Sequence, residues 1–194
     1  MIPFHVMQTS PSKMPNYIMR RTLQTLGPRY VYKHFDDLEI LKFFASNPID
    51  GLEAVERRFL SLRSGEHKAD LFRYYYLYVC GGIYFDTDVL LVSNLFSYIE
   101  GRDFVSVSAG NVNGALFQGF LAASPGHPVL YKAVLDVCET SDQSLASDHH
   151  ILCKNLKRFL DDHLENSGAA KNSALLLSEV SHNREVAKSI DANG

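Results

Sequence analysis

Hydrophobic and polar positions divide this chain into short strands and helices. Apolar, β-prone runs predict strands at residues 2–8, 29–33, 83–85, 104–108 and 115–122. Apolar residues at helical spacing predict helices over 15–25, from Asp36-Asp37 onward, and over 50–62, 66–80, 128–138 and 145–164. The chain therefore opens strand–helix–strand, which is typical of a layered α/β domain. The stretch after Glu165 gives no clear pattern.

Length and composition indicate one ordinary globular domain. The 194 residues are enough for a single core, with 46% hydrophobic and 21% charged residues. We expect one domain over residues 1–194, and the ending AKSIDANG, which lacks a closing element, suggests a chain cut from a longer protein. The formal net charge of −3 argues against a nucleic-acid partner.

The N-terminal sequence, the apolar runs and the cysteines indicate in which cellular compartment the protein is expected. The start MIPFHVMQTS has neither the basic region nor the continuous apolar region of a signal peptide, and no apolar run approaches the roughly 20 residues of a membrane span. Cys80, Cys138 and Cys153 are far apart and form no CxxC pair, which predicts free thiols. We expect a cytoplasmic or otherwise soluble protein without a membrane span.

The helix predicted at 66–80 carries an unusual polar face. Asp70, Arg73, Tyr74 and Leu77 follow i, i+3, i+4, i+7 spacing and so share one side of the helix. Gly81-Gly82 comes directly after it and is expected to end the helix. Taken alone, this face is explained as well by an intrahelical Asp70–Arg73 pair beside the core as by a binding site.

Two carboxylates follow the strand predicted at 83–85. Strand alternation would place Asp86 and Asp88 on the same side, where they repel unless a cation or a proton lies between them. Oxygen ligands of this kind suit Mg²⁺ or Mn²⁺, which keep positions open for phosphate oxygens. A turn or helix-cap pair is the competing explanation, but the end of a strand in an α/β sheet is where ligands bind.

The segment from Lys68 to Val89 resembles the DXD-containing glycosyltransferases. That family includes fungal initiating mannosyltransferases, bacterial capsular-polysaccharide sugar transferases and, more distantly, large glucosylating toxins. The matching positions are Asp70, Arg73, Gly81-Gly82, Tyr84 and Asp86-Thr87-Asp88. The opening IPFHVMQT resembles the family's first strand, and residues 113–130 resemble, more loosely, the segment after the DXD strand.

The resemblance implies a fold and a set of roles. The fold would be of the glycosyltransferase A type, a Rossmann-like α/β domain with a mixed central sheet flanked by helices. Asp88 would bind the metal directly, and Asp86 would contact the metal and the hydroxyls of the donor. Asp70 and Arg73 would hydrogen-bond the transferred sugar. The other implied donor contacts are Tyr84 along the nucleotide, Gln8 and Thr9 at its border, and Asn113 near donor or acceptor.

Some positions depart from the family pattern. Met7 and Ser10 stand where relatives often have His and Trp, and the chain contains no tryptophan. No C-terminal His/Trp motif is evident, so a third protein ligand for the metal is unassigned. Asp148 or His150 could supply it, although a helix cap at Ser147 or Asp148 explains this stretch better. For the remaining histidines we expect surface or hydrogen-bonded roles: His5, His34, His67, His127, His163 and His182.

The implied reaction is a metal-dependent hexosyl transfer that retains the anomeric configuration. The cofactors would be Mn²⁺ or Mg²⁺ and a nucleotide-sugar, with a UDP-sugar favoured and GDP-mannose also compatible. The acceptor would be a glycan, a protein side chain or a lipid-linked sugar. No residue stands out as a catalytic nucleophile, which fits a reaction in which the leaving phosphate takes the acceptor's proton.

Two other functions remain open from the sequence. A haloacid-dehalogenase-like phosphatase would use Asp86 as nucleophile and Asp88 as general acid, with Asp161-Asp162 as its downstream acidic pair. That fold usually opens with this motif, whereas about eighty residues precede it here. The other alternative is a sugar-nucleotide-binding domain that keeps the fold without catalysis.

Overall fold

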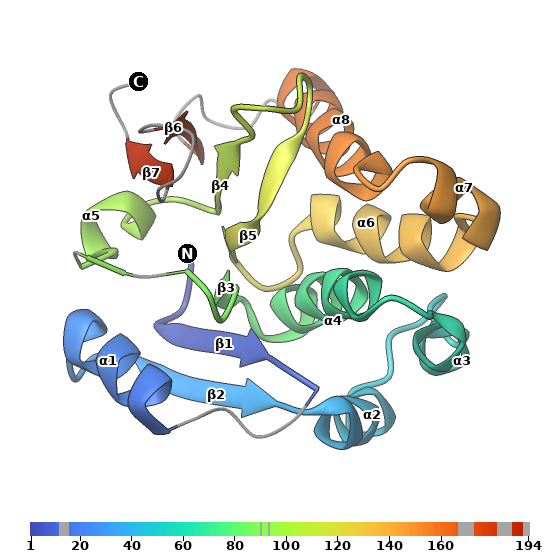
Figure 1. Cartoon of the computed structure of the whole chain (residues 1–194), viewed down its shortest axis with the longest axis horizontal. Coiled ribbons are helices and arrows are strands. Elements are labelled where there is room, and N and C mark those ends of the chain that lie inside the picture. The colour runs from blue at the N-terminus through green and yellow to red at the C-terminus, as the bar shows by residue number, and fades with distance from the viewer. Residues whose placement is uncertain (12–15, 90, 93, 167–172, 182–187, 192–194) are drawn as a thin grey trace.

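The computed structural model describes residues 1–11, 16–89, 91–92, 94–166, 173–181 and 188–191. Within these ranges, seven strands form one mixed sheet in the order β2-β1-β3-β5-β4-β6-β7 (Figure 1). The strands are β1 (His5–Thr9), β2 (Val31–Phe35), β3 (Gly82–Phe85), β4 (Phe104–Ser108), β5 (Leu116–Ala123), β6 (Ala174–Ser181) and β7 (Lys188–Asp191).

The directions of the strands determine which strand ends lie side by side. β1 runs parallel to both β2 and β3, so the carboxyl ends of these three strands meet at one edge of the sheet. β5 is antiparallel to its neighbours β3 and β4. β4 pairs in parallel with β6, and β6 pairs antiparallel with β7. The DXD residues follow β3 and therefore lie next to the carboxyl end of β1.

Helices cover both faces of the sheet (Figure 1). Those of the described chain are α1 (Asn16–Leu26), α2 (Asp37–Ser46), α3 (Val55–Ser61), α4 (Gly65–Cys80), α5 (Phe96–Ile99), α6 (Pro128–Glu139), α7 (Asp142–Ser147) and α8 (Ile151–Asn166). No helix of this described part is long and apolar enough to cross a membrane.

Two hydrophobic clusters hold these layers together. Tyr84 points into the cluster formed with α2, α3, α4, α6, α7 and α8, while its neighbours Ile83 and Phe85 point into the cluster formed with α1 and α5. This alternation along a fully buried strand is the period of two expected for β-structure. β3 is therefore buried on both faces, so a binding site can open only beyond its ends.

Local signals fix α4, the helix that flanks the site. The Ser64 side chain accepts a hydrogen bond from the Glu66 backbone N–H at 3.3 Å and caps the start of the helix. The helix ends at Gly81, which has a φ of 63°. A Cβ at Gly81 would also lie 2.8 Å from Pro3, so backbone angle and close packing both require glycine. The predicted helix end at Gly81 is confirmed.

Several predicted boundaries were wrong for physical reasons. The strand predicted at 29–33 begins at Val31, because Tyr30 N–H still bonds to the Gly27 carbonyl in a turn. The helix predicted at 50–62 begins at Val55, after a turn in which Gly51 has a φ of 83°. The single helix predicted at 145–164 is two helices, because Asp148 ends α7 and its side chain accepts from His150 N–H at 3.0 Å. α5, β6 and β7 were not predicted.

Candidate active site

The two aspartates of the DXD motif lie in a turn beyond the end of β3. The strand ends at Phe85, opposite Phe120 of β5, and Asp86 N–H then bonds to the Gly119 carbonyl at 3.0 Å. A second bond, from Val89 N–H to the Asp86 carbonyl at 3.1 Å, closes the turn. The prediction that strand alternation aligns Asp86 and Asp88 was therefore wrong. Asp86 is half-buried, and Asp88 is exposed.

One carboxylate oxygen of Asp86 is held by neighbouring side chains. The Tyr84 hydroxyl donates a hydrogen bond to Oδ1 at 2.5 Å, and Arg73 Nη2 lies 3.5 Å from the same atom. The Arg73 guanidinium also lies over the Tyr84 ring, 4.2 Å from its centroid. Burial raises the pKa of Tyr84 above its usual value, so its hydroxyl stays protonated and donates. The orientation of Asp86 is therefore fixed before any ligand binds.

Arg73 connects α4 to the end of the sheet. Its Nε donates to the Ala69 carbonyl at 3.2 Å, and its Nη1 donates to the Gln118 carbonyl of β5. Burial opposes its charge, but Tyr84, Asp70 and Asp86 outweigh that effect and raise the pKa of Arg73. Arg73 is consequently a buried, permanent cation between carboxylates.

Asp70 shares this buried environment. Its Oδ1 lies 3.5 Å from Arg73 Nη2, so the intrahelical pair expected from the sequence does form. Both side chains are almost fully buried, unlike an exposed surface pair. Burial raises the pKa of Asp70, while the Arg73 charge acts in the opposite direction. An acid kept from water beside a fixed cation suits recognition of polar groups of a ligand.

Gln8 and Thr9 stand at the end of β1, beside the DXD turn. Gln8 is fully buried, its Nε2 donates to the Asp86 carbonyl at 3.1 Å, and its Oε1 accepts from the Tyr32 hydroxyl at 3.0 Å. Thr9 is the last residue of β1 and is partly buried. Through its bond to the Asp86 carbonyl, Gln8 supports the backbone at Asp86.

A cavity of about 290 Å³ opens beside Asp86. It is bounded by the first half of α4, the β4–β5 connection and the corner between α7 and α8. Its lining residues are Glu66, His67, Asp70, Arg73, Asp86, Ala109, Asn111, Val112, Ala115, Leu116, Phe117, Gln118, Gly119, His149, His150 and Cys153.

The cavity includes only some of the residues that the sequence singled out. It brings Asp70, Arg73 and Asp86 together on one side. The other predicted site residues do not line it: Gln8, Thr9, Tyr84, Asp88 and Asn113. Asn113 is exposed in the β4–β5 connection, where Asn111 lines the cavity instead.

The carboxylate oxygens near the DXD turn fit a divalent cation that keeps most of its coordination positions for another ligand. Among the described residues, no group of three or more His, Cys, Asp and Glu side chains could hold a metal ion. Asp148 is engaged by Lys154 at 2.8 Å and by His150 N–H. It is the residue that ends α7, so the helix N-cap that the sequence favoured here was wrong. Two carboxylates, Asp86 and the exposed Asp88, match the way Mg²⁺ binds together with substrate phosphates.

Sequence reasoning missed much of the cavity. His67 lies three residues before Asp70 on the same helix face, and that spacing could have identified it. The expectation of surface or hydrogen-bonded roles was wrong for His5, His67 and His127, which each bury a ring nitrogen without a hydrogen-bond partner. His182 lies outside the described residues. Gln118, His149 and Cys153 reach the site only through tertiary packing.

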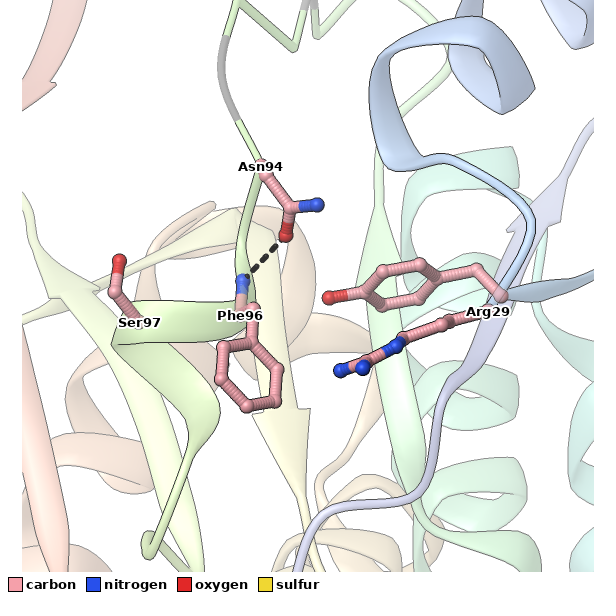
Figure 2. Close-up of a pocket in the computed structure, with 5 residues that line it drawn as sticks. Arg29, Asn94, Phe96 and Ser97 are labelled. Carbon is pink, nitrogen blue, oxygen red and sulfur yellow. Dashed lines mark hydrogen bonds between the residues drawn. The ribbon is translucent and has the colours of Figure 1, made fainter.

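A second cavity, of about 370 Å³, lies near the start of β2 (Figure 2). It is lined by Arg29, Tyr30, Asn94, Phe96 and Ser97. The Arg29 guanidinium lies over the Phe96 ring, 5.5 Å from its centroid, and Asn94 Oδ1 accepts from Phe96 N–H at 2.8 Å. It contains no carboxylate and none of the predicted site residues, so we place the candidate active site at the cavity beside Asp86.

Comparisons with known proteins identify the family and the fold. The family model described as "Glycosyltransferase sugar-binding region containing DXD motif" matches residues 8–105. Among solved structures, the chain is similar to "PaToxG Glycosyltransferase", with 14% sequence identity and a TM-score of 0.57. That match covers 86% of this chain and 71% of the other, and it confirms the predicted fold, a mixed sheet flanked by helices. No curated protein matches the chain.

Proposed function

The chain belongs to the glycosyltransferases whose sugar-binding region contains a DXD motif, and from this premise we propose that it transfers a sugar from a nucleotide-diphosphate sugar to an acceptor hydroxyl in a metal-dependent, retaining reaction. The observation that carries the proposal is that neighbouring side chains fix the orientation of the Asp86 carboxylate. Tyr84 and Arg73 hold its Oδ1 at the end of the sheet, next to the exposed Asp88 and beside a polar cavity.

Asp88 and Asp86 would hold the Mn²⁺ or Mg²⁺ ion. Oδ1 of Asp86 is already occupied, whereas Oδ2 has no hydrogen-bond partner among the described residues and remains for a ligand. Asp88 is exposed at the same turn. When bound, such a cation neutralises the charge that develops on the diphosphate leaving group.

Asp70, Arg73 and Asp86 would orient the transferred sugar. All three line the cavity, and Arg73 lies 3.5 Å from each of the two carboxylates. A rigid set of carboxylates and guanidinium donors can fix the hydroxyls of a sugar while an acceptor hydroxyl approaches the anomeric carbon. The nucleotide would lie along the ends of β1 and β3, near Gln8, Thr9 and Tyr84, with Asn113 at the rim.

A front-face mechanism, in which the acceptor hydroxyl attacks the anomeric carbon from the side on which the leaving phosphate departs, would account for retention of configuration. Both carboxylates closest to the sugar position are engaged by Arg73, which makes neither a free nucleophile. The leaving phosphate would then accept the proton of the acceptor hydroxyl. The transition state would carry oxocarbenium character, as in glycoside hydrolysis.

The donor and acceptor remain proposals at the level of class. A UDP-sugar is favoured as donor and GDP-mannose is also compatible. A glycan, a protein side chain or a lipid-linked sugar would be the acceptor. That residues 1–194 form a single catalytic domain also remains a prediction.

The phosphatase alternative is disfavoured by family membership and by the contacts of its required acids. Asp86 Oδ1 is occupied by Tyr84 and Arg73. Asp161, its candidate downstream acid, lies within α8 and pairs with Lys157 at 2.6 Å. A non-catalytic sugar-nucleotide-binding domain is the alternative that needs an experiment.

Donor turnover tests the proposal directly. The protein is incubated with UDP-glucose, UDP-galactose, UDP-N-acetylglucosamine or GDP-mannose and Mn²⁺, and release of the nucleoside diphosphate is measured. We expect release from one donor, its loss with EDTA, and a sugar product that NMR shows with the donor's anomeric configuration. Binding without release would support the non-catalytic alternative, and hydrolysis of p-nitrophenyl phosphate instead would support the phosphatase.

A further inference from the structure

Two polar atoms at the active-site cavity are buried without hydrogen-bond partners. They are Nε2 of His67 and Oε1 of Gln118, and both residues line the cavity. Buried polar groups in folded proteins are nearly always paired, because an unpaired one loses its water contacts without replacement. Two of them at one cavity suggest that a ligand supplies the missing hydrogen bonds.

Gln118 is held in place by its neighbours. Its Nε2 donates a hydrogen bond to the Tyr74 hydroxyl, and its backbone carbonyl accepts one from Arg73 Nη1. With Nε2 engaged in this way, Oε1 of the same amide is left without a hydrogen-bond partner.

His67 lies on the same face of α4 as Asp70 and Arg73. It is 8% exposed, and its ring centroid lies 5.9 Å from that of His149 in the turn between α7 and α8. An imidazole nitrogen can donate or accept, depending on the tautomer. His67 therefore extends the row of polar side chains along the cavity by one helical turn beyond Asp70.

We infer that His67 and Gln118 bind hydroxyl groups of the transferred sugar and so determine which sugar the enzyme accepts, an inference that rests on the proposed function. A hydroxyl group both donates and accepts, so it can pair with either tautomer of His67 and either orientation of Gln118. The nucleotide is not the partner, because Gln8 and Thr9, at the nucleotide end, do not line this cavity.

Both atoms are shielded from water in the ligand-free protein. Both residues line the cavity, so a sugar that fills it would lie against them. In a site built to hydrogen-bond a hydroxyl, a ligand that lacks this hydroxyl leaves the polar atom unpaired and binds more weakly. Discrimination between sugars is therefore the property these residues control.

The test separates binding of the sugar from binding of the nucleotide. Calorimetric titrations with Mn²⁺ compare UDP-glucose with UDP, UDP-N-acetylglucosamine with UDP, and GDP-mannose with GDP. The pair that the wild type binds is then used with His67→Ala and Gln118→Leu, while thermal unfolding shows that each variant is folded. We expect each variant to bind the nucleotide-sugar about three- to tenfold more weakly, with an unchanged Kd for the nucleoside diphosphate.

Deoxy analogues of the same nucleotide-sugar identify the hydroxyl. The analogue that lacks the group bound by His67 should weaken binding to the wild type but not further to His67→Ala, since the contact is already lost. His163→Ala, which removes a histidine of α8 outside the cavity, should behave as wild type.

The outcomes are distinguishable. If the wild type binds none of the compounds, the proposed function fails, and this inference fails with it. If the wild type binds a nucleotide-sugar and both variants bind it equally well, only this inference is overturned. Equal weakening for nucleotide-sugar and nucleoside diphosphate would also overturn it.

Discussion

The hydroxyl of Tyr84 donates a hydrogen bond to Oδ1 of Asp86, two residues further along the chain. The two side chains bridge the point where β3 ends and the DXD turn begins. Because Arg73 approaches the same oxygen, the second carboxylate oxygen, Oδ2, remains for a ligand. This relationship explains how a residue in a turn can have a defined orientation.

Removing the Tyr84 hydroxyl should impair catalysis without unfolding the protein. In Tyr84→Phe the ring still packs under Arg73, but Asp86 loses a charge-assisted hydrogen bond. Such bonds contribute about 1.5–3 kcal/mol, and partial exposure of Asp86 places this one near the lower value, so we expect kcat/KM to fall about tenfold. Steady-state kinetics of donor turnover measures the loss. Tyr30→Phe, whose hydroxyl is also buried but lies outside this site, is the matched control.

Asp88 should be essential for activity and dispensable for folding. Its side chain is exposed, so Asp88→Asn should change the free energy of unfolding by less than about 0.5 kcal/mol. Loss of a metal ligand should lower metal-dependent turnover by about 100-fold or more. Asp162→Asn, an exposed aspartate on α8, should retain full activity. Near-normal turnover by Asp88→Asn would contradict its assignment as a metal ligand.

Gly119 should tolerate no side chain. A Cβ there would lie 2.6 Å from Phe117 Cε1 and 3.1 Å from Asp86 Oδ2. Gly119→Ala should therefore push Phe117 or Asp86 aside, lower stability by about 1–3 kcal/mol and weaken metal-dependent donor binding. Urea unfolding and calorimetry measure the two effects. In Gly65→Ala nothing lies within 4 Å of the new methyl group, and donor binding should be unchanged.

His127 should make the fold sensitive to acid. Burial, together with the nearby His163, lowers the pKa of His127 from 6.5 to about 4. The unfolded chain binds a proton at this residue between those pH values while the folded chain does not, so stability falls as the pH drops from about 6.5 through about 4. The loss amounts to about 3 kcal/mol at most.

Replacing His127 should remove this dependence. Urea unfolding of His127→Leu should show a flatter pH profile of stability between pH 6.5 and 4 than the wild type. An equally steep profile in the variant would show that other groups cause the acid sensitivity.

Much of the fold could be predicted because its signals are local. The helix ending at Gly81, the short strand before Asp86 and the helix starting at Asp36-Asp37 all depend on neighbouring residues. The start of that helix is confirmed, and the Asp36 side chain caps it by accepting from Glu39 N–H at 2.9 Å. The break between α7 and α8 was missed, because Ser147 to His150 reads as helix until the Asp148 side chain bonds to the backbone.

The site was predicted only in part. Helical spacing indicates that Asp70 and Arg73 share one face, and the resemblance to the DXD-containing glycosyltransferases implies that they act together with Asp86. Gln118 and His149 come from elements far along the chain, and only packing of β5 and of the α7–α8 corner against α4 brings them to Asp70. Nothing in the local pattern indicates that contact.

The central claim is that the DXD turn binds a nucleoside diphosphate through a metal ion. Calorimetric titration of UDP, GDP, CMP and ADP, with Mn²⁺ and then with EDTA, tests it most directly. We predict that one nucleoside diphosphate binds in the presence of Mn²⁺ and that EDTA abolishes the binding. Binding of none of these nucleotides to the folded protein, or binding that EDTA leaves unchanged, would contradict the claim.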